Sequence, residues 1–550
     1  MPLRNSPCRC GSGQRLKHCC GWLGDPAERP GASLPSQEEL DALTTARQVE
    51  IFRLQRQQGL GRPIISFELS GTRVVIVGAR AFQGRWVFFY DFLTDYIKHV
   101  LGRSWGENEQ REAADDQHPV MRWAEHLQRQ MERAKAQETS PDGPFSMPAS
   151  GAATAWFELA YDLYLIHHHA REEDQDAIKA LIARLRLAPE FLGARHEARA
   201  AGLLLRAGFG VSWQEGVGRR HGGHGEFTAV HPKTGKRFWV ECKCRQGSGR
   251  KTPRFTHLIT NALRKLAEHE RLLFIELDLP EPQIARDGGG WPAWAASKLR
   301  HLEATADAAL PKAHVVFSNF PHHRRLEAPG DGTGIVLEGF RTDMYGLGQP
   351  ISLESAIERR RSHAELEALW SSIEVHGHIP PTFDASFPRV DEANRLLIGR
   401  EYQLADDAIG TLESAVVDEG AGTASGIFHL TSGERMIYEV PLSEDEMHAW
   451  RRDPQTFFGQ LDPPGGPIRG PLDAYDFFAS SMETLSRQDL LSAMQGRHDF
   501  EEILHLPQPT LLHLHVLGLV SSLDQRGSFP PPPEWTRRMR PRRKLGPSQD

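Results

Sequence analysis

The sequence is poor in cysteine, and its few cysteines are confined to two short stretches. Six cysteines occur among 550 residues, four of them within residues 8–20 and the other two at positions 242 and 244. Small disulfide-stapled proteins spread their cysteines along the chain, so this distribution argues against a disulfide framework. The first four are spaced for metal ligation instead.

Long apolar runs are also missing. No stretch of about 18 apolar residues is present, which argues against a transmembrane helix, and the N-terminus lacks the apolar core of a secretory signal. Hydrophobic residues make up 39% of the chain and charged residues 25%, which is ordinary for a globular protein. We therefore expect a cytoplasmic protein without membrane insertion, folded into roughly three or four domains.

The chain has neither an overall positive charge nor a P-loop. Its net charge of −7 argues against a globally basic nucleic-acid binder, and the missing G-x-x-x-x-G-K-[ST] pattern disfavours a P-loop ATPase. Positive charge is concentrated locally, because residues 219–254 hold ten lysines and arginines and two acids, Glu226 and Glu241. Residues 537–544 add six cations to a proline-rich tail that predicts disorder, and this tail could contact nucleic acid or serve only solubility.

The N-terminal cysteines predict a zinc site. Four thiolates can close a tetrahedral zinc centre, and Gly11-Ser12-Gly13 supplies a tight turn between the two pairs. The pattern Cys-x-Cys-Gly-Ser-Gly, followed by Lys-x-Cys-Cys-Gly, resembles the SEC-C motif, which occurs at the C-terminus of the SecA translocation ATPase and in many other bacterial proteins. The resemblance implies a structural Zn²⁺ and a module that docks protein partners, with ligands Cys8, Cys10, Cys19 and Cys20. His18 is an alternative ligand.

The run FWVECKCRQ, residues 238–246, predicts a strand with chemistry on one face. Alternation places Glu241 and Lys243 on one side and Cys242 and Cys244 on the other. The cysteines are then small core residues, with a second metal site as the alternative. The plain interpretation of Glu241 and Lys243 is an exposed ion pair.

Two further acids converge on this strand. HGEFTAVHPKTGKRFWVEC has the shape of a β-hairpin, and Glu226 opens its first strand. Upstream, a helix that ends before Gly208 carries Glu197 on its apolar face, where a carboxylate needs a cation or a metal. Carboxylates on adjacent strands can hold Mg²⁺, which polarises a phosphodiester and helps generate hydroxide, and a lysine can stabilise the developing charge. His221 and His224 flank this region, either as phosphate or metal contacts or as incidental loop residues.

This arrangement resembles the PD-(D/E)XK nuclease superfamily, the restriction-endonuclease-like fold. The matching positions are the helix acid Glu197, the first-strand acid Glu226 and the E-x-K element Glu241-Cys242-Lys243. A helix over 256–270 and the strand LLFIELDLP would complete the order αβββαβ. The family most often has Asp where this chain has Glu226. The resemblance implies a Mg²⁺-dependent nuclease with Glu197, Glu226, Glu241 and Lys243 as catalytic residues and Glu226 and Glu241 as Mg²⁺ ligands.

Taken together, these patterns predict a multi-domain protein of mixed α+β and α/β class. Alternating strands after residue 383 predict a small antiparallel sheet or barrel, followed by helices. We expect a nuclease that acts on DNA rather than RNA, in defence or DNA processing, or alternatively a SEC-C adaptor whose nuclease-like domain is an inactive scaffold. The expected segments are a zinc knuckle at 1–22, a linker and helix at 23–60, an α/β-helical domain at 61–187, the nuclease-like domain at 188–330, a connection at 331–382, a β-rich and helical domain at 383–525 and a basic tail at 526–550.

Overall fold

The chain forms two compact units, of which a computed structural model describes most residues. The described residues are 37–113, 116–137, 149–213, 226–245, 255–279, 290–327, 334–342, 352–387, 390, 395–404, 408–461, 468 and 470–527. One unit comprises Met1–Arg53 and Arg389–Pro463, and the other comprises Leu54–Pro388 and Pro464–Asp550. The predicted zinc ligands Cys8, Cys10, Cys19 and Cys20, the histidines His221 and His224, and the tail beyond residue 527 lie outside the described residues.

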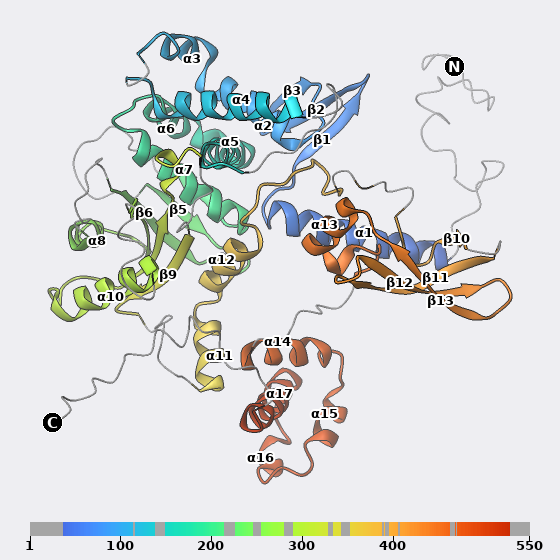
Figure 1. Ribbon diagram of the computed structural model, residues 1–550. Helices are drawn as coiled ribbons and strands as arrows, with labels where there is room; N and C mark the ends of the chain where they lie inside the picture. Colours follow the sequence, from blue (N-terminus) through green and yellow to red (C-terminus); the bar gives the residue numbers. More distant parts are fainter. Residues whose placement is uncertain are drawn as a thin grey trace, which may run out of the picture. The chain divides into compact units, whose positions relative to one another are not determined.

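The unit that contains residues 389–463 is built on a four-stranded antiparallel sheet, drawn in orange in Figure 1. Burial alternates along its strand β12, where Ala424 and Phe428 are fully buried, so one face of the sheet packs a core. The predicted small antiparallel sheet is therefore confirmed, and it stays open. Its elements are β10 (Glu401–Gln403), β11 (Ile409–Asp418), β12 (Thr423–Leu430), β13 (Arg435–Pro441), α13 (Glu444–Arg452) and η6 (Pro454–Thr456).

The other unit begins with a three-stranded meander and a layer of helices. The residues of α1 (Gln37–Gln58) are divided between the two units after Arg53, and the helix ends at Gly59, which has a φ of 92° that suits glycine. Two tight turns with positive φ, at Ser70–Gly71 and at Gly78, separate the strands. The elements that follow α1 are β1 (Ile65–Leu69), β2 (Thr72–Val77), β3 (Arg80–Gly84), α2 (Phe89–Leu101), α3 (Arg103–Glu109), α4 (Pro119–Gln137), α5 (Gly151–His169), η3 (Glu172–Asp174) and α6 (Gln175–Leu185).

A six-stranded mixed sheet forms the centre of this unit. Its strands lie in the order of the sequence, β4-β5-β6-β7-β8-β9. β4, β5 and β6 are antiparallel, β6, β7 and β8 are parallel, and β9 is antiparallel to β8. The elements are α7 (Phe191–Arg206), β4 (Gly210–Trp213), β5 (Phe227–Val230), β6 (Arg237–Cys244), α8 (Phe255–Leu263), β7 (Glu270–Glu276), α10 (Gly290–Thr305), β8 (Ala313–Asn319), η4 (Pro321–His323) and β9 (Gly334–Phe340).

The two faces of this sheet bury separate cores. One face carries Phe238, Phe274 and Val316, which join the large core that includes α5, α7 and α12. The other face carries Trp239, Leu273 and Phe317, which pack with residues of α8 and α10. Figure 1 shows α8 and α10 on one side of the sheet and α7 and α12 on the other. We call these two surfaces the α7 face and the α8 face.

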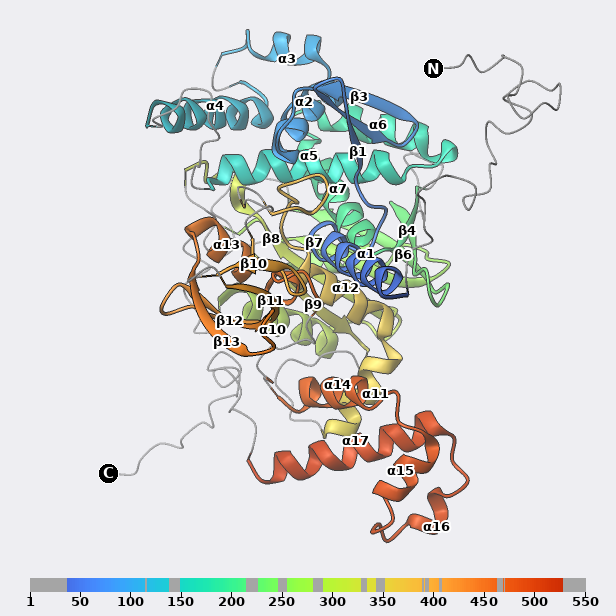
Figure 2. The same cartoon turned by 90° about the vertical axis from the view of Figure 1, so that its right-hand side faces the viewer.

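The remaining helices belong to the same unit. α11 and α14 are joined by Arg360, whose guanidinium donates to both carboxylate oxygens of Asp476 at 2.7 and 2.5 Å. Figure 2 shows α17 beside α14, with α15 and α16 grouped near one end of α17. These elements are α11 (Leu353–Ser362), α12 (Ala364–Val375), α14 (Pro471–Ser481), α15 (Arg487–Ala493), α16 (Phe500–Ile503) and α17 (Gln508–Gln525).

The observed elements confirm the mixed α and β class, but two segments differ from expectation. The interval 331–382, expected to be a connection, contributes the edge strand β9 and the helices α11 and α12. The helix expected over 256–270 ends at Leu263, and Glu270 already begins β7. Just after the helix, the Lys265 carbonyl accepts a hydrogen bond from Arg271 Nη2 at 3.1 Å, which ties this turn to the strand.

The predicted C-terminal domain at 383–525 is distributed over both units. Its strands fall in the unit with residues 389–463, whereas α14 to α17 fall in the unit that holds the six-stranded sheet. Among the described residues, the structure contains no helix with the length and apolarity that a membrane crossing requires.

Candidate active site

The β5–β6 hairpin brings two acids to the same place on the sheet. Phe227 pairs with Val240 in the antiparallel ladder, and the Glu226 amide donates to the Val240 carbonyl at 2.9 Å. Glu226 directly precedes β5, and the charge of Glu241, the residue that follows Val240 on β6, acts on it. The hairpin and the adjacency of its two carboxylates were predicted from the alternation of the sequence.

Glu241 lies on the α8 face and has no exposed surface. Its Oε1 contacts Lys243 Nζ, two residues along the same strand, and Lys265 Nζ at 2.6 Å. The two lysines are about a quarter to a third exposed, so they connect the buried carboxylate to solvent. In the Glu241–Lys243 pair the carboxylate is therefore buried and the ammonium is partly exposed. The interpretation of the pair as an exposed ion pair is wrong for Glu241.

The acidic charges of this cluster raise the pKa of Lys243 and also the pKa of Glu226. Burial alone lowers the pKa of Lys243, but the Glu241 and Glu226 carboxylates outweigh it and hold that pKa above its ordinary value. Burial raises the pKa of Glu226 to about 7, and the charges of Glu197 and Glu241 add to that rise. Lys265 and Lys243 oppose it. Three acids are thus close enough to sense one another.

Glu197 lies where the helix pattern predicted, on the buried side of α7. Its required cation is Arg184 of α6, whose two terminal nitrogens donate to both carboxylate oxygens at 2.7 and 2.6 Å. A bidentate guanidinium–carboxylate pair of this kind has strong, fixed geometry. Glu197 therefore influences Glu226 by its charge while its own oxygens are held by Arg184.

The cysteines of β6 take the opposite, α7 face. Cys242 is buried in the large core with Phe238 and Val240, as predicted, and both Cys242 and Cys244 are free thiols. Cys244 borders a small cavity of about 30 Å³, room for about one water, that Arg195, Arg199 and Glu276 also line. Burial raises the pKa of both thiols well above the usual range, so neither thiol favours the thiolate that ligates a metal.

The donor set at Glu226 and Glu241 fits a hard divalent cation. Carboxylate oxygens are the ligands that Mg²⁺ prefers, and the carboxylates of Glu226 and Glu241 are close enough for their charges to interact. Glu241 Oε2 is buried and has no hydrogen-bond partner among the described residues, so this oxygen is available to an ion. The two cations next to Oε1 balance the charge of the carboxylate when no ion is bound.

Sequence reasoning missed two residues of the cluster, Lys265 and Arg184. Lys265 follows α8 and reaches Glu241 across a parallel β-α-β connection, and no local pattern marks such a contact. Arg184 lies 13 residues before Glu197 on the preceding helix. The sequence did indicate that a buried Glu197 needs a cation, so a basic partner could be expected. It did not indicate which basic residue that partner is.

Comparison of the chain with models of protein families, with curated proteins and with solved structures finds no match. Any functional conclusion therefore depends on the chemistry and geometry of the residues themselves.

Proposed function

We propose that this protein is a Mg²⁺-dependent nuclease of the PD-(D/E)XK type, with Glu226 and Glu241 as metal ligands and Lys243 beside the reacting phosphate. DNA is the proposed substrate. The observation that carries the proposal is the buried Glu241 carboxylate, with the Lys243 ammonium beside it and Glu226 close enough for the two carboxylates to interact.

The order of elements supports the same proposal. α7, β4, β5, β6, α8 and β7 follow one another as the αβββαβ core of that superfamily requires, with the E-x-K element on the third strand. The acid that the superfamily carries on its first helix corresponds to Glu197, whose charge adds to the rise in the pKa of Glu226. The chain also concentrates ten lysines and arginines in residues 219–254, which suits a phosphate backbone.

Each side chain has a definite task in this chemistry. A bound Mg²⁺ would polarise the phosphodiester and help to generate the attacking hydroxide. Glu226, with its pKa near 7, gives up its proton when a cation binds, so metal loading strengthens as pH rises through neutrality. Lys243 stabilises the negative charge that develops on the phosphate oxygens, and Lys265 contacts the Glu241 carboxylate.

A second function is favoured by one specific observation. Arg184 holds both oxygens of Glu197, and two lysines contact Glu241, so the cluster neutralises its own acids. A self-neutralised cluster suits a non-catalytic scaffold that serves an adaptor whose N-terminal SEC-C-like segment docks a partner. The two functions differ in whether Glu241 is needed for metal-dependent cleavage.

The deciding experiment is a cleavage assay with the purified full chain. Supercoiled, linear and single-stranded DNA, and RNA, are incubated with Mg²⁺ or Mn²⁺. The variants Glu241→Gln and Lys243→Met are compared with Glu268→Gln, an exposed acid between α8 and β7. Far-UV circular dichroism and a denaturant titration verify that each variant is folded.

The nuclease proposal predicts metal-dependent cleavage that falls by at least about a hundredfold in Glu241→Gln and Lys243→Met, with Glu268→Gln unchanged. Cleavage that persists in both variants would identify a contaminating enzyme and overturn the proposal. If the folded native protein cleaves none of the substrates, the scaffold function replaces it.

A further inference from the structure

A second cluster of ligating side chains lies on the α7 face of the central sheet, where the parallel strands β7 and β8 begin. Glu270 begins β7, His314 lies at the second position of β8, and His363 directly precedes α12. One ligand atom from each of these three residues lies within 4.8 Å of the other two. The sequence had not marked them, because they come from three elements far apart in the chain.

The strand registers separate this cluster from the candidate active site. Leu272 pairs with His314, and Leu272, Phe274 and Val316 belong to the core on the α7 face. Because alternate residues share a face, Glu270 and His314 also project to the α7 face. Glu241 pairs with Leu273 and projects to the α8 face, three positions or about 10 Å further along the strands. The two groups cannot share one ion.

The contacts within the cluster leave a place for a cation. His314 Nε2 and Glu270 Oε1 form a short hydrogen bond, while Lys236 binds the other oxygen, Oε2, at 3.0 Å. The rings of His314 and His363 meet nearly edge to face with centroids 5.4 Å apart. An ion that replaces the hydrogen between His314 and Glu270 would therefore leave the Lys236 pair intact.

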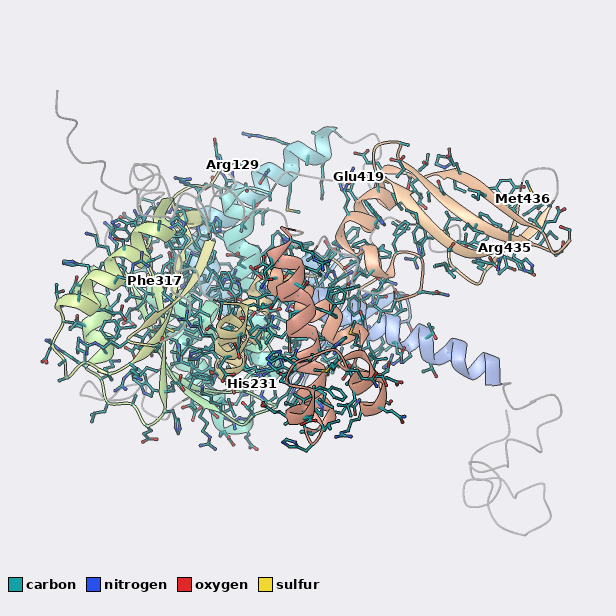
Figure 3. The ribbon with its side chains drawn as sticks, turned by 90° about the horizontal axis from the view of Figure 1, so that it is seen from below. Arg129, His231, Phe317, Glu419, Arg435 and Met436 are labelled. Atoms are coloured by element: carbon teal, nitrogen blue, oxygen red, sulfur yellow. The ribbon has the colours of Figure 1, made fainter. Side chains whose placement is uncertain are left out.

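Burial and access also fit a bound ion. The His314 side chain is 1% exposed, and its Nδ1 has no hydrogen-bond partner among the described residues. The Glu270 side chain is 37% exposed, which gives an ion a route from solvent. Figure 3 labels His231, which lies in the β5–β6 turn at this same end of the sheet.

We propose that Glu270, His314 and His363 bind one divalent transition-metal ion of the zinc class. Two imidazoles and one carboxylate are a donor set that suits Zn²⁺, whereas Mg²⁺ prefers oxygen ligands alone. Three protein ligands leave a fourth tetrahedral position for water. The site is independent of the proposed nuclease activity.

The position of the site indicates what the ion does. Glu270 and His314 belong to the sheet, whereas His363 caps α12, so one ion would tie this helix to two parallel strands. Lys236 makes a parallel connection, because its Nζ lies 3.0 Å from Glu270 and 3.6 Å from Glu365 in the first turn of α12. An ion that binds the folded state alone stabilises it by mass action. The ion therefore fastens α12 to the sheet.

The test measures metal content and thermal stability in the full chain. Protein freed of metal with a chelator is loaded with Zn²⁺, Co²⁺ or Mg²⁺, and bound metal is determined by mass spectrometry after gel filtration. The double variant His314→Gln/His363→Gln is compared with His378→Gln, which removes an exposed imidazole beyond the end of α12. Glu270→Gln serves as a second variant, because glutamine keeps the size of the side chain and can still hydrogen-bond to His314 and Lys236.

The proposal predicts that the double variant binds about one zinc ion fewer per chain than the native protein. Zn²⁺ but not Mg²⁺ raises the Tm of the native protein and of His378→Gln. Any zinc held by the N-terminal cysteines is recognised in the Co²⁺ form by thiolate charge-transfer absorption, which a site of two histidines and a glutamate lacks.

Glu270→Gln is expected to weaken zinc binding at this site by at least about tenfold. Equal zinc content in the native protein, the double variant and Glu270→Gln would overturn the proposal. An equal rise in Tm with Zn²⁺ in all of them would overturn it as well. Should the double variant fail to fold, the comparison with Glu270→Gln alone decides the question.

Discussion

Lys265 Nζ lies 2.6 Å from Oε1 of Glu241, the same oxygen that Lys243 contacts. A carboxylate with no exposed surface is thus held by two ammonium groups that reach it from different elements, β6 and the segment after α8. The two ammonium groups offset the buried negative charge of the candidate site. Their contribution to stability can be measured without a catalytic assay.

Replacement of Lys265 by methionine should destabilise the fold, because Glu241 then keeps one cation where it had two. We expect the free energy of unfolding to fall by about 1 to 2 kcal/mol. This is less than the cost of a fully unpaired buried charge, because Lys243 still contacts Glu241 and because solvent partly screens Lys265. Urea unfolding measures the change. Lys298→Met, an exposed lysine on α10, is the matched control and should stay within about 0.5 kcal/mol of the native protein. Equal stability of the two variants would contradict the role of Lys265.

The pKa of Glu226 predicts a pH dependence of stability. Its carboxyl loses a proton near 4.5 in the unfolded chain and near 7 in the fold. Between these values the folded state binds more protons, so the contribution of Glu226 to stability falls as pH rises from about 4.5 to about 7 and then levels off. Glu226→Gln removes this titration, so the stability of the variant relative to the native protein should rise between pH 4.5 and pH 8.

The gain should be on the order of 1 to 3 kcal/mol, since one pKa unit corresponds to about 1.4 kcal/mol. Denaturant titrations of both proteins at pH 4.5 and pH 8, without added metal, measure it. Glu268→Gln, which removes an exposed acid, should show no such change with pH. A stability difference between Glu226→Gln and the native protein that does not vary with pH would show that Glu226 titrates at its ordinary value.

The bidentate pair between Arg184 and Glu197 should be costly to break from one side. Arg184→Met leaves a carboxylate that is 8% exposed without its guanidinium, so we expect a loss of about 3 to 5 kcal/mol. The double variant Arg184→Met/Glu197→Leu should recover much of this loss, because no buried charge is then left. Arg129→Met breaks an exposed pair with Glu125 on α4 (Figure 3 labels Arg129) and should cost less than about 1 kcal/mol. The prediction fails if the double variant is as unstable as Arg184→Met.

Gly202 and Gly193 of α7 should respond in opposite ways to alanine. A Cβ at Gly202 would lie 2.9 Å from Cγ of Asp162 on α5, which Arg199 and Arg206 hold in place at 3.6 Å. We expect Gly202→Ala to destabilise by about 1 to 3 kcal/mol despite its better helix propensity. Gly193→Ala meets nothing nearer than Arg184 Nη2 at 3.9 Å and should be neutral or stabilising by up to about 1 kcal/mol. Thermal unfolding of both variants compares them, and a more stable Gly202→Ala would contradict the close approach of α5 and α7.

Local periodicity accounts for what the sequence could predict. The alternation of residues 238–245 placed Glu241 and Lys243 together, and the helix pattern put Glu197 on the buried side of α7. The Gly208 stop and the hairpin turn at Gly235 also follow from local chemistry, and both glycines have positive φ. Each of these features depends on residues within a few positions of one another.

What the sequence could not predict depends on contacts between distant elements. Lys265 reaches Glu241 across a parallel connection, and His314 meets Glu270 over a separation of 44 residues. β9, α11 and α12 were missed because the short apolar runs of residues 331–382 have weak periodicity and their burial depends on elements elsewhere in the chain. Such contacts are set by the register of the sheet, which a single sequence does not state.

The central sheet keeps its strands in the order in which they leave the ribosome, from β4 to β9. Each strand can therefore add to a free edge of the strands already formed, and none has to insert between two that are paired. β5, which Glu226 directly precedes, and β6, which carries Glu241, are completed before the last three strands are synthesised. A nascent chain can thus assemble the acidic pair early, while the ends of the sheet are still growing.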